Sequence, residues 1–415
     1  MDACVQPGLL PVNEAIARIL AALKPITATE NVSLMDCLDR VLAENVIAPI
    51  NVPGGDNSAM DGYALRHSDV HEELIVIGEA FAGHPFSGAI AAGQAVRIMT
   101  GGLVPAGADT VVMQENVTRH ENKILINTRP DSGENIRRAG EDIAQESLVL
   151  SKGHLLTALD IGLLASLGIH QVNVFQRIKI ALLTTGDELL MPGAPHQTGK
   201  IYDSNRPLLY ALLKRLPVDV LDLGVVPDNP DSLRAAFLAA QQFADMVIST
   251  GGVSVGDADY TKDILAELGE INFWKIAMKP GKPFAFGLLG KNAQARATDC
   301  WFCGLPGNPV STAVTYHQLV VPALRYLAGE IPAEPLVIKA VAIKTLKKQP
   351  GRMDFQRGIF SASNGVNSVS SAGLQSSGVL SGMGKANCYI RLAAERGTVT
   401  EGEIVDVVLF DRFIR

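Results

Sequence analysis

The sequence predicts a multidomain protein of the α/β plus β class, built around one domain with a mostly parallel sheet. The chain has 415 residues, which is enough for about two to four domains of roughly 150 residues each. Apolar runs alternate with amphipathic helical segments over 178–328, a pattern typical of βα units. Residues 329–415 show period-2 stretches instead, which predict a small all-β, barrel-like domain.

The N-terminal part of the chain contains helical segments on both sides of a β-rich stretch. Apolar residues recur at helical spacing over 12–23 and stop before Pro25. Between Val52 and Gly140 the apolar runs are short and are broken by Gly, Pro and Asp, as in a β-rich unit. We therefore expect helices over 12–23, 34–44 and 154–168, a mixed helical domain made of 1–50 and 141–177, and a β-rich domain inserted at 51–140.

The alternating segment gives the clearest pattern of elements. Its apolar runs predict strands at 178–183, 218–226, 245–249, 271–278, 283–289 and 301–304. Amphipathic periodicity predicts helices at 205–216, 232–243, 260–268 and 310–327. We expect these elements to form one α/β domain over 178–328.

Composition excludes several classes of protein. Asp plus Glu number 43 and Lys plus Arg 36, giving a net charge of −7, so a basic nucleic-acid face is not expected. No uncharged apolar run reaches the ~18 residues of a membrane span, and the N-terminus lacks a signal-peptide pattern. The five cysteines are an odd number and do not suggest a disulfide framework. We expect a soluble, cytoplasmic protein.

Unusual residues gather where the predicted strands end. In open parallel sheets, ligands bind outside the carboxyl ends of the strands. Five segments should therefore meet at one edge of the sheet: 184–188, 226–228, 249–260, 279–283 and 304–309. A single glycine turn, N-capping Asp or surface lysine would mean little, but five loops on one edge favour a functional site.

The composition of this edge suggests phosphate chemistry. Glycine-rich backbone leading into a helix suits an anion, and three lysines add positive charge: Lys275, Lys279 and Lys282. Carboxylates are the ligands that Mg²⁺ prefers beside substrate phosphates, and five are available: Asp187, Glu188, Asp228, Asp257 and Asp259. These residue types together favour a metal-assisted reaction at a phosphate ester or anhydride.

Other candidate groups have simpler explanations. Cys300 and Cys303 would point to opposite faces of a strand, so core packing is favoured over a shared metal. A basic cluster is interpreted as a solvated strand face, with anion binding as the minority alternative: Lys344, Lys347, Lys348 and Arg352. The polar segments 56–64 and 135–142 can be a structured turn and a surface ion-pair cluster, or parts of a site.

Taken in order, the motifs resemble the MoeA family of molybdopterin molybdenumtransferases, which is related to the gephyrin E domain. The resemblance spans essentially the whole chain and rests on eight segments: 56–64, 100–101, 135–142, 185–188, 201–205, 251–260, 279–283 and 305–309. It implies an elongated homodimer of four-domain subunits, in which 178–328 binds molybdopterin and 1–50 with 141–177 serves as a linker and dimerisation domain.

The resemblance also implies a reaction. It is the last step of molybdenum cofactor synthesis, in which adenylylated molybdopterin and molybdate react with Mg²⁺ as cofactor and AMP is released. A molybdopterin adenylyltransferase is the implied upstream partner. Two other functions are left open, an adenylyltransferase that activates molybdopterin with ATP and a scaffold without catalysis, and tungstate is an open alternative to molybdate.

Site residues are carried over from the resemblance by motif. Catalytic roles are implied for Asp61, Asp142, Glu188, Asp228 and Asp259. Substrate binding is implied for Thr100, Arg137, Asp187, Ser254, Lys275, Pro306 and Pro309. Molybdate binding is implied for Lys279, Lys282, Arg357 and Ser377, and metal binding for Glu188, Asp257 and Asp259. Asp61, Thr100, Arg137 and Asp142 would belong to the partner subunit's half of the site.

Overall fold

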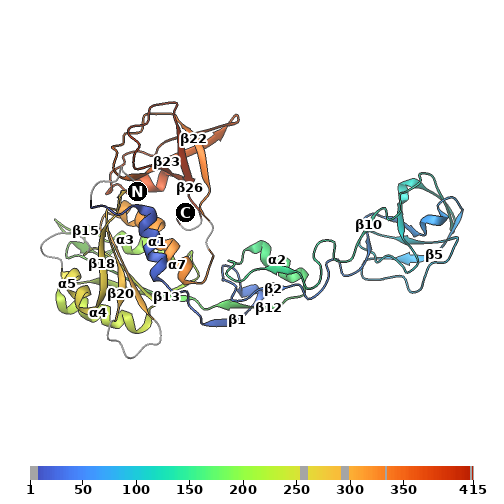
Figure 1. Ribbon diagram of the computed structural model, residues 1–415, viewed down its shortest axis with the longest axis horizontal. Helices are drawn as coiled ribbons and strands as arrows, with labels where there is room; N and C mark the ends of the chain where they lie inside the picture. Colours follow the sequence, from blue (N-terminus) through green and yellow to red (C-terminus); the bar gives the residue numbers. More distant parts are fainter. Residues whose placement is uncertain (1–7, 253–259, 291–298, 332–333, 412–413, 415) are drawn as a thin grey trace. The chain divides into compact units, whose positions relative to one another are not determined.

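The structure, a computed structural model, describes residues 8–252, 260–290, 299–331, 334–411 and 414 (Figure 1). Contacts divide the chain into two compact units, which are described separately. One unit comprises Asn31–Leu38 and Leu42–Asn173. The other, here called the sheet–barrel unit, comprises Met1–Glu30, Asp39–Val41 and Val174–Arg415.

The first unit contains the β-rich segment that the sequence predicts. Its six-stranded sheet has the order β7-β4-β6-β5-β9-β8. The strands are β4 (Gly62–Leu65), β5 (Leu74–Ala80), β6 (Gln94–Ile98), β7 (Thr110–Met113), β8 (Val117–His120) and β9 (Lys123–Ile126). Leu65, Leu74 and Ala95 are fully buried between these strands, so the sheet has its own apolar core.

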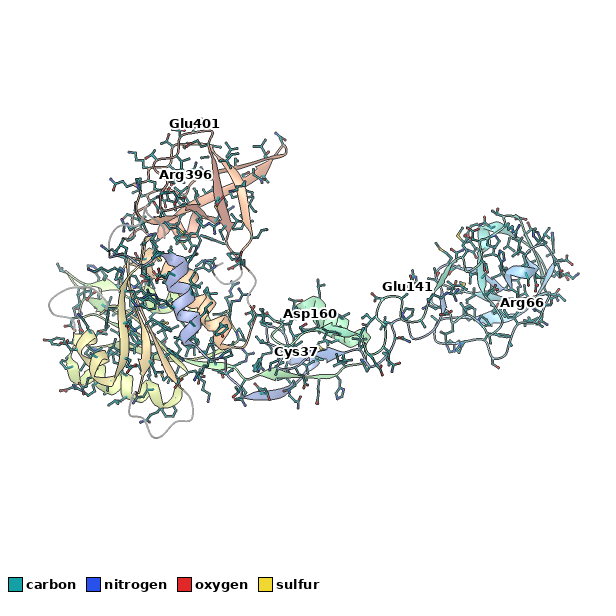
Figure 2. The ribbon with its side chains drawn as sticks, viewed as in Figure 1. Cys37, Arg66, Glu141, Asp160, Arg396 and Glu401 are labelled. Atoms are coloured by element: carbon teal, nitrogen blue, oxygen red, sulfur yellow. The ribbon has the colours of Figure 1, made fainter. Side chains whose placement is uncertain are left out.

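Short elements precede and follow this sheet in the sequence. Three two-stranded pairs join β1 (Thr29–Ser33) to β12 (Gln171–Phe175), β2 (Val46–Ile47) to β11 (Leu148–Leu150), and β3 (Asn57–Ser58) to β10 (Ile136–Arg137). Helix α2 (Ala158–Ser166) begins with a capping box between Thr157 and Asp160; Figure 2 labels Asp160. Single 3₁₀ turns occur at Leu34–Asp36, His67–Asp69 and Gln114–Asn116.

The helix predicted over 34–44 is wrong beyond its first turn. Asp39 has a positive φ of 60°, a conformation that interrupts a right-handed helix. The following amides donate across the fold instead of along a helix, Leu42 to the carbonyl of His154 and Ala43 to that of Asn173. Strand-like pairing therefore replaces helical hydrogen bonding here.

The sheet–barrel unit is built on a six-stranded sheet of order β16-β13-β17-β21-β20-β18. The strands are β13 (Ile178–Thr185), β16 (Val218–Val226), β17 (Met246–Thr250), β18 (Gly269–Lys275), β20 (Pro283–Leu289) and β21 (Cys300–Leu305). The first four in this order are parallel, and β20 is antiparallel to both of its neighbours. The mostly parallel sheet is confirmed, although the predicted strand 271–278 ends at Lys275.

Helices cover this sheet. Side chains of α4 (Pro230–Phe243) and α5 (Tyr260–Leu268) share one core cluster with the sheet, in which Phe237 packs edge-on against Phe302. Outside this core cluster, α3 (Asn205–Leu213) packs against α6 (Pro309–Thr315). The predicted helix 310–327 is divided into α6 and α7 (Val321–Leu327) by a wider π-helical turn at Tyr316–Val320.

The N-terminal helix α1 (Val12–Ala22) lies alongside α7, as Figure 1 shows. It buries Val12, Ala15 and Ile19, and the amide of Ile26 donates to the carbonyl of Leu327 at 2.9 Å. Residues up to Glu30 therefore group with the sheet–barrel unit, whereas the sequence groups 1–50 with 141–177.

The C-terminal segment forms a closed barrel of five strands. These are β22 (Val337–Ala342), β23 (Met353–Ser363), β24 (Val366–Ser371), β25 (Cys388–Leu392) and β26 (Ile404–Leu409), and β23 closes the ring by pairing with both β24 and β25. The short strand β19 (Met278–Lys279) joins the edge of β23, and α8 (Ser381–Lys385) follows β24. The predicted barrel-like domain is confirmed.

None of the helices in the described ranges has the length and apolarity needed to cross a bilayer. The cysteines at 37, 300, 303 and 388 are buried. Cys303 lies in the core with its Sγ 3.6 Å from the Sδ of Met246, and burial raises the pKa of its thiol. Core packing therefore explains Cys303, as the sequence indicates.

Candidate functional site

The strand ends that lead into the five loops singled out in the sequence lie at one edge of the sheet. Strands β13, β16, β17 and β21 run in one direction, and β18 runs the same way because two antiparallel pairings separate it from β21. Their carboxyl ends, from Thr185, Val226, Thr250, Lys275 and Leu305, therefore open onto the same side. We call this side the loop edge.

Two glycines shape the loop that leaves β17. Gly251 has a φ of 86°, and a Cβ there would lie 2.4 Å from the carbonyl oxygen of Thr185. Gly252 has a φ of 62°, and its Cβ would lie 2.2 Å from Oγ1 of Thr261. Both positions combine left-handed backbone with contact too close for any side chain. The glycine pair is therefore required for this turn.

A buried polar network ties three of the loops together. The Nδ2 of Asn205 donates to Oγ1 of Thr250 at 3.1 Å and to the carbonyl of Gly307 at 2.7 Å. Nearby, Oγ1 of Thr184 donates to Oδ2 of Asp203 at 3.0 Å. Hydrogen bonds between buried groups fix their relative positions, so the ends of β13, β17 and β21 are held in register at the loop edge.

Several buried oxygen atoms at the loop edge have no hydrogen-bond partner in the described part of the chain. They are Oδ1 of Asn205, Oγ of Ser249 and Oγ1 of Thr261. A buried polar atom without a partner costs about 1–3 kcal/mol. Such a group of atoms on the border of a glycine turn fits a polar ligand that would supply the missing partners.

Three carboxylates gather beside this turn. The amide of Asp228 donates to Oδ1 of Asp187 at 3.4 Å, and the carboxylate of Glu188 occupies the space where a Cβ of Gly186 would lie, 2.6 Å away. Burial raises the pKa of Asp228, and the negative charges of Asp187 and Glu188 raise it further. The three carboxylates therefore concentrate negative charge beside the turn, and a cation close to them would relieve their repulsion.

The structure describes only part of the set of residues predicted to bind a metal ion. Within the described ranges, no three His, Cys, Asp or Glu residues form a group that could hold a metal ion. Of the predicted ligands, Glu188 is described, whereas Asp257 and Asp259 lie outside the described residues, as does the predicted substrate residue Ser254.

The loop before α6 contains the predicted residues Pro306 and Pro309. Pro309 is the first residue of α6, where its missing N–H is tolerated. Oγ1 of Thr312 donates to the carbonyl of Pro306 at 2.6 Å and lies 3.0 Å from that of Asn308, which holds the loop against the helix. The amide of Val310 donates to the carbonyl of Ser377 at 3.1 Å, so Ser377 lies at the beginning of α6.

The three predicted lysines lie on the connection between the sheet and the barrel. Lys275 ends β18, Lys279 belongs to β19 on the barrel, and Lys282 follows the turn; all three side chains are exposed. Gly281 has a φ of 103°, and a Cβ there would lie 2.3 Å from Oγ1 of Thr315. The turn between Lys279 and Lys282 is thus packed closely against α6.

Arg357 lies among main-chain carbonyls of the barrel. Its side chain is fully buried, and its Nη2 donates to the carbonyls of Leu374 at 2.8 Å and Ser376 at 3.0 Å. Its Nη1 is 3.4 Å from the carbonyl of Gln375. The guanidinium therefore holds the segment that leads into Ser377, and its Nε has no partner in the described residues.

The remaining predicted residues belong to the other compact unit. Oδ1 of Asp61 accepts hydrogen bonds from the amide of Thr100 at 2.8 Å and its Oγ1 at 2.7 Å. These bonds lower the pKa of Asp61. Arg137 is exposed opposite Asn57 in the β10–β3 pair, and Asp142 is exposed, its amide donating to the carbonyl of Val52.

Within segment 135–142 the two arginines differ. Arg138 forms an ion pair with Asp56 at 2.6 Å, which accounts for the surface-cluster interpretation of that arginine. Arg137 has no such partner among the described residues. The structure thus separates a structural arginine from one available to a ligand.

A cavity of about 620 Å³ is lined by residues that were interpreted as a solvated strand face. Lys347, Lys348 and Arg352 surround it together with Lys279. Lys348 is only 6% exposed, so that interpretation is wrong for Lys348. The signal in the sequence was the adjacent pair of lysines, because neighbouring residues of an extended segment point to opposite sides.

Three family models match successive parts of the chain. The model of the MoeA N-terminal region (domain I and II) matches residues 10–168. The model of a probable molybdopterin binding domain matches 181–326, and that of the MoeA C-terminal region (domain IV) matches 339–410.

Individual relatives match over nearly the full length. The chain is 47% identical over 411 residues to the molybdopterin molybdenumtransferase of Haemophilus influenzae, covering 98% of this chain and 100% of that protein. It is 36% identical to that of a Nostoc species, covering 92% and 88%. The crystal structure of the molybdopterin biosynthesis MoeA protein from Pyrococcus horikoshii superimposes with a TM-score of 0.83 at 28% identity, covering 97% of this chain and all of the other.

Proposed function

The chain belongs to the MoeA family, and on that premise we propose that it is a molybdopterin molybdenumtransferase of molybdenum cofactor biosynthesis. Its substrates are adenylylated molybdopterin and molybdate. Water adds across the bond between the two phosphates of the adenylylated substrate, so that AMP leaves and the pterin keeps its own phosphate. The two dithiolene sulfurs replace two oxygens of molybdate, which take up protons and leave as water.

The main support for this proposal is the combination of residue groups at the loop edge. At the loop edge, a glycine turn with unpartnered buried oxygens, a cluster of three carboxylates and a lysine-bearing turn come from neighbouring strand ends. A reaction between a phosphoanhydride and an oxyanion needs polar contacts for the substrate, a cation for the phosphates and positive charge for the oxyanion. The three groups of residues supply one requirement each.

In this proposal the hydroxyls of Thr185, Ser249 and Thr261 bind the polar part of the pterin nucleotide. Lys279 and Lys282 attract molybdate through charge-assisted hydrogen bonds. Ser377, held by its contact with Val310, borders the same turn. These groups position the reactants and stabilise charge, so no covalent intermediate with the protein is needed.

We propose Mg²⁺ as the cofactor. The fit rests on the crowding of Asp187, Glu188 and Asp228, whose mutual repulsion a divalent cation would relieve. Asp257 and Asp259 are proposed to add further ligands. When bound, the ion supplies neutralisation of the charge on the substrate phosphates.

We further propose that the protein works as a homodimer in the cytoplasm and receives its substrate from a molybdopterin adenylyltransferase. Asp61, Thr100, Arg137 and Asp142 are then supplied to each site by the partner subunit. Asp61 is fixed by its two hydrogen bonds from Thr100, and Arg137 is exposed, as residues that complete a neighbour's site must be.

The test is AMP release from adenylylated molybdopterin by the purified protein with Mg²⁺, with molybdate added or withheld. We expect release that depends on molybdate, and a fall of about 100-fold in Glu188→Gln. Glu401→Gln removes the same charge from an exposed barrel turn (Figure 2) and should retain activity. No release from a folded protein, with or without molybdate, would contradict the proposal.

A further inference from the structure

The cavity of about 620 Å³ lies where β19 joins the barrel. Four of its lining residues are cations, and Asp354 is the single carboxylate among them. The chain as a whole has a net charge of −7, so this positive concentration is local. A cavity lined by one sign of charge raises the local concentration of ions of the opposite sign.

Two of the cations are occupied by the protein. The Nζ of Lys348 donates to the carbonyls of Gln349 at 3.3 Å, Ala394 at 3.2 Å and Arg396 at 2.7 Å. These three bonds use every donor of an ammonium group. Figure 2 labels Arg396 in the barrel. Lys279 lies 3.7 Å from Oδ2 of Asp354, so that carboxylate is shared with one cation.

The side chains of the other two cations, Lys347 and Arg352, form no hydrogen bond or ion pair with the described residues; only the main-chain carbonyl of Lys347 accepts a hydrogen bond, from Nε2 of Gln356 at 3.0 Å. Lys347 is exposed and Arg352 is half-buried. The positive charges of Arg352 and Lys279 also oppose the charged form of Lys348, whose pKa is lowered chiefly by burial. Cations that repel one another in a cavity are stabilised by an anion between them.

We propose that Lys347 and Arg352, together with Lys279, form a binding site for a tetrahedral oxyanion with two negative charges. The guanidinium of Arg352 can bind two oxygens side by side, and the lysines add point charges around them. Arg357 is not part of this site, because its donors face the carbonyls of 374–376. It is a positioning residue for the segment before Ser377.

The site is argued from its residues, and only the identity of its ligand rests on the proposed function. One oxyanion of this shape and charge is free molybdate, and the other source is a phosphate group of the substrate. The cavity volume falls in the range of small-molecule sites, ~300–1,000 Å³, which accommodates either. Binding experiments can separate the two sources without requiring turnover.

The experiment is isothermal titration of the full chain, at constant ionic strength, with molybdate, inorganic phosphate or AMP. We expect Arg352→Ala to weaken binding about 10- to 100-fold, the loss expected for a charge-assisted pair of hydrogen bonds. Lys347→Ala should weaken it to a lesser extent, and Arg352→Lys should restore part of the affinity. Lys344→Ala is the matched control, because Lys344 is exposed nearby but does not line the cavity.

Molybdate binding that phosphate and AMP do not displace identifies free oxyanion as the ligand. Displacement by both, with the same dependence on Arg352, identifies a substrate phosphate. Unchanged affinity in Arg352→Ala and Lys347→Ala, an equal loss in Lys344→Ala, or no binding of any anion by the folded protein would overturn the site. Binding that depends on Arg352 without molybdate-dependent AMP release would contradict the proposed function while leaving the site intact.

Discussion

Asp228 is the residue at which stability and function oppose each other. Its pKa is raised by burial and by the charges of Asp187 and Glu188, so the folded protein favours the protonated acid. The stabilisation associated with a raised carboxyl pKa is present at low pH and is lost as the pH rises through the folded-state pKa. At neutral pH the charged carboxylate therefore destabilises the fold.

Replacing Asp228 with Asn should consequently stabilise the sheet at pH 7, by about 0.5 kcal/mol, as expected for a partly exposed charge. The gain should shrink at pH 5. Both tryptophans of the chain, Trp274 and Trp301, lie in this sheet, so urea unfolding followed by their fluorescence measures the effect. A variant less stable than the parent at pH 7 would contradict the charge-repulsion account.

Mg²⁺ should reverse the order of stability of the parent protein and Asp228→Asn. A ligand that binds only the folded state raises its stability with concentration, so millimolar Mg²⁺ should shift the unfolding midpoint of the parent protein upward. The shift should be clearly smaller in Asp228→Asn, and Glu401→Gln should respond like the parent. Equal shifts in all three proteins would remove the carboxylate cluster as the cation site.

Arg352 and Arg357 show what a sequence can indicate about single residues. The motif implies a molybdate contact for Arg357, which stays a prediction, and the structure adds that its guanidinium is buried against main-chain carbonyls. Arg352, five positions earlier, faces a cavity. The residue types were informative, whereas the direction of each side chain depends on the closed barrel, which brings distant strands together.

Arg357→Ala should therefore destabilise the barrel, by about 2–4 kcal/mol, because it removes a large buried side chain and its hydrogen bonds. Differential scanning calorimetry of the full chain measures this loss. Arg352→Ala is the comparison and should stay within about 0.5 kcal/mol of the parent. Similar stability of the two variants would mean that Arg357 does not hold the segment 374–376.

At the scale of elements, the turn after β17 depends on its glycines. Gly252→Ala would place a methyl group 2.2 Å from Oγ1 of Thr261 on left-handed backbone. We expect a loss of about 1–3 kcal/mol, measured by tryptophan fluorescence during urea unfolding. Gly307→Ala, at the same edge but with no atom within 4 Å of the added group, should be nearly neutral. An equally neutral Gly252→Ala would contradict the tight turn.

Most elements of the α/β segment could be predicted from apolar periodicity, since buried strands and amphipathic helices leave strong patterns. The loop edge could be predicted as well, because strand direction follows from the βα alternation. Two features could not. The amides of Leu42 and Ala43 are paired with distant segments, which a local helical pattern does not reveal, and β19 leaves the sheet to join the barrel.

At the scale of the whole molecule, the residues implied for the reaction are divided between two compact units. Asp61 and Thr100 belong to one, and the loop edge and the cationic cavity belong to the other. If a homodimer forms each site from two subunits, then two inactive variants should complement each other when one is substituted in the first compact unit and the other in the sheet–barrel unit.

Mixing Asp61→Asn with Glu188→Gln chains, after dissociation and reassociation, should restore about one quarter of the parent activity. Half of the dimers would be mixed, and each mixed dimer would have one intact site of two. Reassociated single variants are the controls and should stay inactive. Failure to recover activity in mixed dimers verified by mass would show that both groups act within one subunit.

The central claim is that the loop edge couples cleavage of the adenylylated substrate to molybdenum transfer. The most direct test is a single-turnover reaction in which released AMP and pterin-bound molybdenum are quantified in the same sample. We expect equal amounts of both, and neither without molybdate. Release of AMP without molybdenum bound to the pterin, at saturating molybdate, would show a hydrolase and contradict the account.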